Sequence, residues 1–355
     1  MASALKVGVL TFHKCINYGS YWQARCLVEH LRSRGHQAEL LDHDCRCVRR
    51  AEVRCALQPK LPERTPRHEL KSYAEKTRRF VAAIDGLPLS RAFSLHEPWA
   101  ARDYDAIVVG SDEVWNFRHP WYGSKPIFFG DDLKTGRLVS YAASFGNHSA
   151  RDGLERHWAH KLARFSAISV RDENSWHLVR GATGVEPELV IDPCLLFPSP
   201  AEAQPASAEP YALVYGHGFP SWLKALAGKW SFQTGIRLVS VGYFNDFAHE
   251  QRVAEGPIEF ARLMAGARAV VTNFFHGCIF ALLQRKPWAT VPSDYRAIKI
   301  PDLAAMIGVQ DRLIDEHTGE NQFGRLLDAA AHPAVERRIA ELRGRSKAYL
   351  DAALA

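Results

Sequence analysis

The stretch that decides the fold reads Ala269-Val270-Val271-Thr272-Asn273-Phe274-Phe275-His276-Gly277-Cys278-Ile279-Phe280-Ala281-Leu282-Leu283. Its first three residues are apolar and predict a buried strand, and the apolar run at residues 279–283 predicts the beginning of a buried helix. A turn that leads from a parallel strand into a helix lies at the carboxyl edge of the sheet, where open α/β folds bind ligands. His276 lies in this turn and can hold or pass a proton near neutral pH. A histidine at the start of a helix can also be a simple cap, so both interpretations stay open.

Cationic groups near such turns would favour an anionic ligand. The helix that begins around Gly277 directs backbone N–H groups at the turn. Arg171 follows another predicted strand, where a guanidinium can bind a carboxylate or phosphate through two parallel hydrogen bonds. An ion pair with one of the two acidic residues that follow Arg171 is the alternative. Arg296 and Lys299 can meet an anion from one helical face, unless they form an exposed, solvated pair.

Polar residues also follow other predicted strands. Asp112 comes directly after a strand and is close in sequence to Trp115 and Asn116. A carboxylate can orient sugar hydroxyls while an indole stacks on the face of the sugar. Asp112 can equally be a helix N-cap. Asn17 and Tyr18 follow the first predicted strand in the same way, so both groups are expected at carboxyl edges of parallel sheets.

Strand and helix signals alternate along the whole chain, which predicts an α/β fold with doubly wound parallel sheets. Residues 198–210 contain four prolines and four alanines with almost no bulky apolar side chain, and they indicate a linker. We expect a Rossmann-like domain at residues 1–197, a second one at residues 211–330, and a terminal helix at residues 331–355. Two such domains that face each other leave a cleft, the usual place for a ligand.

The chain of 355 residues has a net charge of +6 and a pI of about 8.9. This basic balance suits an anionic substrate, an anionic membrane surface or nucleic acid. We expect no nucleic-acid partner, because recognition-helix and zinc-finger patterns and long basic runs are missing from the sequence. Residues 45–67 are interpreted as an irregular insertion, and residues 69–84 as a helix whose bases form a solvated face.

Seven cysteines without a CxxC pair indicate reduced thiols. His43, Cys45 and Cys47 could form part of a zinc site, but they lack a second pair of ligands, so we expect no metal. The apolar residues 5–12 predict a first strand rather than a signal peptide. No stretch approaches the ~20 apolar residues of a membrane span. We therefore expect a cytoplasmic protein, with peripheral membrane contact at the inner face.

Several sequence strings occur together in a characteristic order: Gly8-Val9-Leu10-Thr11-Phe12, Asn17-Tyr18-Gly19-Ser20, Val109-Gly110-Ser111-Asp112-Glu113-Val114-Trp115-Asn116, Tyr141-Ala142-Ala143-Ser144-Phe145-Gly146, Ser169-Val170-Arg171-Asp172-Glu173-Asn174-Ser175, Val190-Ile191-Asp192-Pro193 and Phe275-His276-Gly277. The third and the last of these strings are fairly specific in combination. With this set, which covers about residues 5–300, the chain resembles the polysaccharide pyruvyl transferase family.

The resemblance implies two Rossmann-like halves of GT-B-like architecture. It also implies transfer of the pyruvyl group of phosphoenolpyruvate to two hydroxyls of a sugar, which gives a pyruvate ketal and phosphate. In the family, the residues that correspond to His276 and Arg171 are tied to donor binding and catalysis. The implied acceptor belongs to a cell-surface polysaccharide, such as an exopolysaccharide, or to its lipid-linked precursor. Phosphoenolpyruvate is a co-substrate in this scheme, and no cofactor is expected.

The resulting site assignment has three parts. The catalytic residues are His276, Arg171 and Asp112. The expected donor-binding residues are Arg171, His276, Gly277, Arg296 and Lys299, and the expected acceptor-binding residues are Asn17, Tyr18, Asp112, Trp115 and Asn116. His276 is the expected acid, while the base, Asp112 or neutral His276, stays open.

The chain also departs from the family pattern. Some members have an arginine at the position of Phe274, so a donor contact from that position is lost here or supplied elsewhere. Many members have an aspartate at the position of Asn273, so a carboxylate role at that position is not expected here. The alternatives are a GT-B glycosyltransferase that uses a nucleotide sugar, a non-catalytic anion- or glycan-binding protein, and a redox or metal protein. The chain lacks the sequence motifs of serine hydrolases, P-loop enzymes, zinc proteases and simple nicotinamide dehydrogenases.

Overall fold

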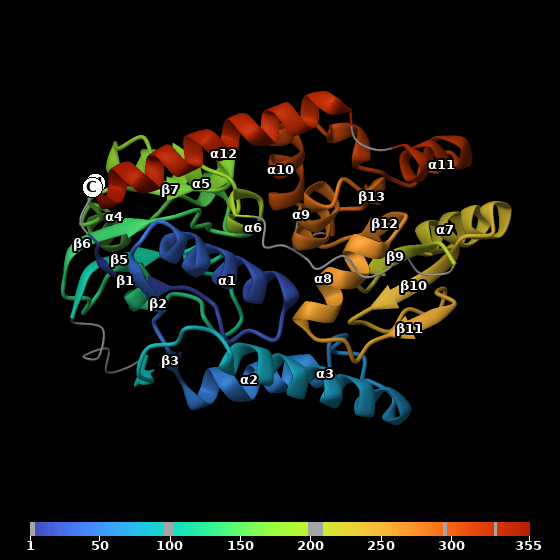
Figure 1. Cartoon of the computed structure of the whole chain (residues 1–355), viewed down its shortest axis with the longest axis horizontal. Coiled ribbons are helices and arrows are strands. Elements are labelled where there is room, and N and C mark those ends of the chain that lie inside the picture. Colours follow the sequence, from blue (N-terminus) through green and yellow to red (C-terminus); the bar gives the residue numbers. More distant parts are fainter. Residues whose placement is uncertain (1–3, 96–102, 198–208, 294–296, 330–331) are drawn as a thin grey trace. The chain divides into compact units, whose positions relative to one another are not determined.

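The structure is a computed structural model (Figure 1), and it describes residues 4–95, 103–197, 209–293, 297–329 and 332–355. The chain divides into two compact units, each built from several segments. The N-terminal unit comprises Met1–Glu52, Ile84–Pro198 and Ile339–Ala355, and the C-terminal unit comprises Val53–Ala83 and Ser199–Arg338.

The N-terminal unit contains a parallel sheet of order β2-β1-β5-β6, and the parallel pair β7 and β8 continues it through bridges from β6 and the residues after it. Its central strands read as apolar runs because both faces of the sheet are covered. The strands are β1 (Lys6–Leu10), β2 (Gln37–Leu40), β3 (His43–Asp44), β4 (Phe93–Ser94), β5 (Tyr104–Val109), β6 (Thr135–Ser140), β7 (Ser169–Val170) and β8 (Glu188–Leu189). The helices are α1 (Tyr18–Ser33), α4 (Arg156–Leu162), α5 (Glu173–Thr183) and α6 (Pro193–Leu196).

The C-terminal unit contains a parallel sheet of order β11-β10-β9-β12-β13. A hydrophobic core lies between this sheet and the helices at residues 221–234 and 320–328. The strands are β9 (Tyr211–Tyr215), β10 (Arg237–Val241), β11 (Glu250–Arg252), β12 (Ala269–Thr272) and β13 (Trp288–Thr290). The helices are α3 (Arg67–Asp85), α7 (Ser221–Thr234), α8 (Pro257–Gly266), α9 (Phe275–Leu283), α10 (Lys299–Ile307) and α11 (Glu320–Asp328).

The segment between β3 and β4 differs from its prediction. Residues 46–57 form a regular helix, α2 (Arg46–Leu57), instead of an irregular insertion. Its outer face carries arginines. Arginine is a good helix former, but so many arginines hide the apolar periodicity that would have predicted the helix. The following α3 forms as predicted, but it belongs mainly to the C-terminal unit, where Tyr73 Oη accepts a hydrogen bond from the N–H of Phe244 at 3.0 Å.

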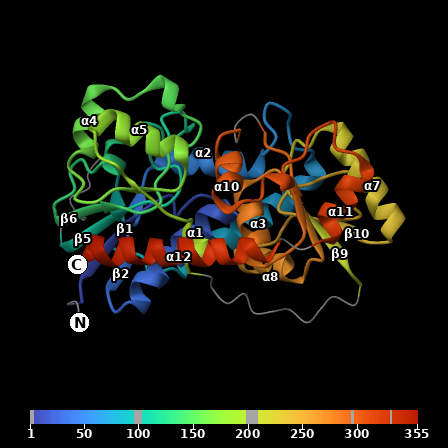
Figure 2. The ribbon, with the colours of Figure 1, turned by 90° about the horizontal axis from the view of Figure 1, so that it is seen from above.

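The long terminal helix α12 (Pro333–Leu354), red in Figure 2, also departs from the predicted division. Its second half completes the N-terminal unit instead of forming a separate element. There Ser346 Oγ accepts from the N–H of Ile191 at 3.0 Å, and Tyr349 Oη donates to the carbonyl of Ser140 at 2.8 Å. These bonds join the helix to the core strands of the N-terminal unit. The helix therefore belongs to that unit, although it follows the second domain in the sequence.

The two sheets confirm the predicted α/β class with two Rossmann-like units. The cleft expected between the units stays a prediction. Within the described ranges, the helices are too short or too polar to cross a bilayer.

Candidate functional site

The carboxyl ends of β1 and β5 form the switch point of the N-terminal sheet, because later strands are added on opposite sides of them. Just past these ends, Thr11 Oγ1 donates to the carbonyl of Ser111 at 2.8 Å. Gln23 on α1 donates to Thr11 Oγ1 at 2.9 Å, and Ser20 Oγ, one helical turn earlier, donates to the carboxylate of Asp112 at 2.7 Å. A buried chain of hydrogen bonds therefore fixes this edge to α1.

Asp112 is held in an unusual backbone conformation. Its φ is 75°, a left-handed value that costs a non-glycine residue about 1–3 kcal/mol, and its side chain is buried. Besides the bond from Ser20, the carboxylate accepts from the N–H of Glu113 at 2.9 Å. The interpretation of Asp112 as a helix cap is wrong, because the chain after it continues in turns rather than in a helix.

Arg171 follows β7 and is buried, with only 2% of its side chain exposed. Its Nη2 lies 3.3 Å from Asp112 Oδ1, and its Nη1 lies 3.1 Å from Asp192 Oδ2. Burial alone would lower the pKa of Arg171, but the carboxylates of Asp112 and Asp192 outweigh it and raise the pKa. Asp172, one of the two acidic residues in the alternative interpretation, caps α5 by accepting from the N–H of Ser175 at 2.7 Å. A role for Arg171 as a donor ligand stays a prediction.

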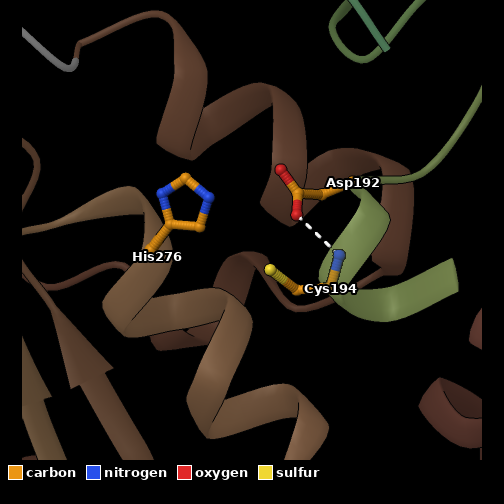
Figure 3. Close-up of side chains that lie close together, drawn as sticks. All are labelled: Asp192, Cys194 and His276. Carbon is orange, nitrogen blue, oxygen red and sulfur yellow. Dashed lines mark hydrogen bonds between the residues drawn. The ribbon is translucent and has the colours of Figure 1, made fainter. Parts of the chain in front are cut away.

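Asp192 also belongs to this network. No role was predicted for it from the sequence, although it lies in one of the motif strings. It precedes α6 and caps it, as Figure 3 shows: its Oδ1 accepts from the N–H of Cys194 at 3.0 Å. The same carboxylate binds Arg171 through its other oxygen. The signal in the sequence was an aspartate directly before proline at a strand end, a typical start of a helix.

Two of the predicted acceptor-binding residues have clear structural tasks. Asn17 caps α1, since its Oδ1 accepts from the backbone N–H groups of Gly19 and Ser20 at 2.8 and 3.3 Å. Asn116 is buried and its Nδ2 donates to Glu113 Oε2 at 2.7 Å. Tyr18, the first residue of α1, is also buried. Whether these residues contact an acceptor stays a prediction.

Trp115 belongs to the core of the N-terminal unit. The indole is 1% exposed, its Nε1 donates to the carbonyl of Phe128 at 2.8 Å, and its ring lies 5.3 Å from that of Phe145. A sugar needs an accessible ring face for stacking. The packing of Trp115 therefore gives no support to its predicted place in the acceptor site.

The switch point of the C-terminal sheet lies between β9 and β12, since β10 and β13 are added on their outer sides. Thr272 Oγ1, at the end of β12, donates to the carbonyl of Tyr215 at 2.7 Å. Asn273 Nδ2 donates to the carbonyl of His217 at 2.8 Å, and Asn245 Nδ2 donates to that of Gly216 at 2.9 Å. Side-chain amides thus join the segments after β10 and β12 to the turn after β9.

His276 projects from the first turn of α9, drawn in Figure 3, and is 8% exposed. The strand-turn-helix arrangement predicted from residues 269–283 is confirmed. Gly277 lies where a Cβ atom would come within 2.0 Å of Thr272 Oγ1, so only glycine lets α9 start this close to β12. Phe274 precedes α9 and provides no side-chain cap, and the helix start suits an anion at the sheet edge.

Of the predicted basic pair after the last strand, the structure describes only Lys299. Lys299 is the first residue of α10 and is buried, which makes an exposed, solvated pair the wrong interpretation for it. Arg296 lies outside the described residues. The donor-binding role of both residues stays a prediction.

Lys76 was interpreted as part of a solvated face, and the structure corrects this. Its Nζ donates to the carbonyl of Gly242 at 2.9 Å and lies 4.2 Å from the ring centroid of Tyr243. Burial lowers the pKa of Lys76 to about 7. The ring of Tyr243 in turn lies 5.0 Å from that of His217, at the carboxyl edge of the sheet. The signal was a lysine spaced three and four residues from Tyr73 and Phe80 on the buried side of α3.

The partial zinc set suggested by the sequence is not assembled. His43 is buried with its Nε2 2.8 Å from the carbonyl of Thr11, whereas Cys47 is exposed. Burial lowers the pKa of His43 to about 3. The imidazole therefore contacts the loop after β1 and does not form a site with the cysteines.

The family model of the polysaccharide pyruvyl transferases matches residues 17–295, which is most of the chain and includes Asp112, Arg171 and His276. The chain belongs to the polysaccharide pyruvyl transferase family. The comparison with curated protein sequences gives no match.

Solved structures show the fold independently. UDP-GlcNAc 2-epimerase from Neisseria meningitidis, solved bound to UDP-GlcNAc, matches with a TM-score of 0.51 at 8% identity and covers 97% of this chain and 98% of its own. The enzyme of that name from Methanocaldococcus jannaschii matches with a TM-score of 0.50 at 10% identity, covering 91% and 92%. Identities this low show a shared fold alone. The predicted GT-B-like class of two Rossmann-like units is confirmed at this level.

Family membership identifies the protein as a transferase of polysaccharide pyruvylation. Within the family, the departures at Asn273 and Phe274 have visible structural roles. Asn273 braces the turn after β9, and Phe274 packs its ring 4.9 Å from Tyr215 and 5.4 Å from His217. An amide can donate to the carbonyl of His217, which a carboxylate at position 273 could not do.

Proposed function

We propose that the protein transfers the pyruvyl group of phosphoenolpyruvate to two hydroxyls of a sugar in a polysaccharide or its lipid-linked precursor. The products are a cyclic pyruvate ketal and inorganic phosphate. The observation that carries this proposal is the family match together with His276 in the first turn of α9 at the C-terminal switch point. We assign donor binding to the C-terminal unit and acceptor binding to the N-terminal unit.

The donor chemistry requires an anion site and an acid. Phosphoenolpyruvate bears a phosphate and a carboxylate, and the start of α9 offers backbone N–H groups and the positive end of the helix dipole. His276 as imidazolium gives its proton to the methylene carbon of the donor, which becomes a methyl group. The central carbon then carries positive charge, which the enol oxygen shares.

The acceptor chemistry forms two C–O bonds and breaks one. The first sugar hydroxyl attacks the central carbon, phosphate leaves from that carbon, and the second hydroxyl closes the ketal. Of the two hydroxyl protons, one restores His276 and the other leaves with phosphate. Asp112, or neutral His276, is the base that accepts a hydroxyl proton. Arg171 is a positioning residue in this scheme, because it binds the carboxylates of Asp112 and Asp192.

Phosphate release from phosphoenolpyruvate, measured across a panel of acceptor glycosides, tests the reaction. We expect release that depends on the acceptor and a product whose mass shows one added pyruvyl group. The variant His276→Gln is expected to lose about 10²–10⁴-fold in turnover. His317→Gln, which changes an exposed histidine with 85% of its side chain accessible, is the matched control.

Three outcomes would contradict the proposal or a part of it. Full activity in a folded His276→Gln variant would remove the acid assignment. Thermal stabilisation by a nucleotide sugar but not by phosphoenolpyruvate, without phosphate release, would favour a glycosyltransferase on the same fold. Stabilisation by phosphoenolpyruvate without turnover on any acceptor would favour a binding protein.

A further inference from the structure

The positive charge of the chain is concentrated in one short segment. Residues 46–79 contain eleven lysines and arginines and four acidic residues, a net charge of +7. The rest of the chain, with 34 bases and 35 acids, has a net charge of −1. The whole positive excess of the protein therefore resides in α2, α3 and the loop that joins them, which we call the basic segment.

The bases of α2 share one side of the helix. Arg46 and Arg50 are four residues apart, Arg54 follows after another four, and all three are exposed. Residues at this spacing lie above one another on a helical surface. The buried residues of the same helix, Val48 and Glu52, lie on the other side. Because one side of the helix is buried, these three arginines lie on the side that faces solvent.

Three of the bases of α3 follow the same rule. Arg67, Lys71 and Arg78 are exposed, and their spacing of four and seven residues places them on one stripe. Tyr73 and Phe80 are fully buried and occupy the opposite side of the helix. Each of the two helices therefore presents its own cationic face to solvent.

Five of the outward cations of the two helices have no carboxylate partner among the residues that the structure describes. Within the described ranges, no carboxylate lies within 4.0 Å of Arg46, Arg50, Arg54, Arg67 or Lys71. Elsewhere, exposed bases commonly have one: Arg180 pairs with Glu186 at 3.4 Å, and Lys229 pairs with Glu320 at 2.5 Å. The charge of the basic segment is therefore available to an anionic surface outside the protein.

Aliphatic side chains accompany the cations. Of the large apolar side chains exposed in the described residues, Val53, Leu61 and Val81 belong to these helices or to their loop, with 38, 43 and 48% of each residue accessible. The exposed aromatic residue Phe232 lies outside the segment. Bases mixed with aliphatic groups suit the interface of a bilayer, whereas a site for single-stranded nucleic acid stacks bases on exposed aromatic rings.

We propose that the basic segment docks the protein on a membrane surface that contains anionic lipids. The guanidinium groups bind lipid phosphates through paired hydrogen bonds, and the aliphatic residues contact the headgroup region. The attraction weakens as salt screens the charges. The proposal does not depend on the reaction of the sheet edges, so either can fail without the other.

Co-sedimentation with vesicles tests the proposal on the full chain. We expect the protein to bind vesicles of phosphatidylcholine and phosphatidylglycerol at low salt, and to be released by high salt and by omission of phosphatidylglycerol. Reversing three bases, in Arg50→Glu, Arg67→Glu and Lys71→Glu combined, should weaken the partitioning by at least about a hundredfold, since each base near an anionic surface contributes about fivefold. Glutamate is well tolerated near helix starts, so the fold should survive.

The matched control reverses three exposed bases elsewhere, Arg151→Glu, Arg325→Glu and Arg337→Glu, and so changes the net charge equally. It should retain most of the binding. An equal loss in the control, or wild-type protein that ignores anionic vesicles, would overturn the proposal. So would binding of a single-stranded oligonucleotide that resists salt better than vesicle binding does. If the triple variant lost its circular dichroism signal, Arg46→Gln with Arg54→Gln in α2 alone would decide, with a loss of at least about tenfold expected.

Discussion

The two sheets of the protein have a similar strand order, but different kinds of side chain follow their strands. In the N-terminal unit, the groups after the strands are charged and bind one another: Arg171 lies between Asp112 and Asp192. In the C-terminal unit, the corresponding turns carry amides, aromatic rings and His276. A closed network of charges holds its own geometry before a ligand arrives, while an edge without such a network can receive the charge of an anionic ligand. The difference between the two edges therefore comes from the residues directly after the strands rather than from the fold.

The sharpest way to break the comparison is to remove the cation of the closed network. The variant Arg171→Met leaves two buried carboxylates without their partner, so we expect the free energy of unfolding to fall by about 3–5 kcal/mol. Urea denaturation measures the loss. Arg180→Met, which removes the exposed pair with Glu186, should cost no more than about 1 kcal/mol. If both variants lost the same small amount, the network would not be the structural centre described above.

A buried lysine on α3, Lys76, lies against the loop after β10, and its pH dependence sharpens the contrast. The pKa of Lys76 is lowered from 10.5 to about 7, so between these values the unfolded chain holds a proton that the folded chain has released. The free energy of unfolding should therefore rise with pH in this window, by up to about 1.4 kcal/mol per pH unit. Denaturation curves from pH 7 to about 10 measure this rise.

Lys76→Met should remove that rise, because methionine does not titrate. Lys71→Met, which changes an exposed residue of the same helix, should keep it. Parallel profiles for Lys76→Met and the wild type would show that Lys76 stays protonated in the fold, and the contrast between the two edges would then be smaller than proposed.

Close packing at the start of α9 gives a third, smaller effect. In Gly277→Ala, the new methyl group would overlap Thr272, so helix and strand must separate at a cost of about 1–3 kcal/mol. The control is Gly181→Ala in α5, where the space around the new methyl group is open and a gain of up to about 1 kcal/mol is expected. Thermal unfolding of both variants gives the comparison, and equal gains would mean that α9 can move away from β12 freely.

The smallest effect concerns Trp115 and tests whether this residue belongs to the acceptor site. Trp115→Phe removes the donor to the carbonyl of Phe128 and should cost about 1 kcal/mol in stability while leaving the KM for the acceptor unchanged. Trp176→Phe, at a partly buried indole of α5, should change neither quantity appreciably. A raised acceptor KM with unchanged stability would restore Trp115 to the acceptor site.

The sequence carries local information well, and the confirmed predictions are local. The apolar run of β12 and the start of α9 were readable because strand and helix periodicities change within a few residues. The network around Arg171 was not, since its partners lie 59 and 21 residues away and periodicity says nothing about them. The helix α2 was missed because arginines obscure its apolar side. Lys76 was misread because charged residues are normally exposed.

The division of the chain into segments has a consequence for the order in which the protein can mature. The last residues of α12 supply Ser346 and Tyr349 to the strands of the N-terminal unit, whose other parts are synthesised far earlier. That unit therefore cannot complete its packing until the residues of α12 have also been synthesised. Changes in α12 should therefore harm the half of the molecule that is translated first.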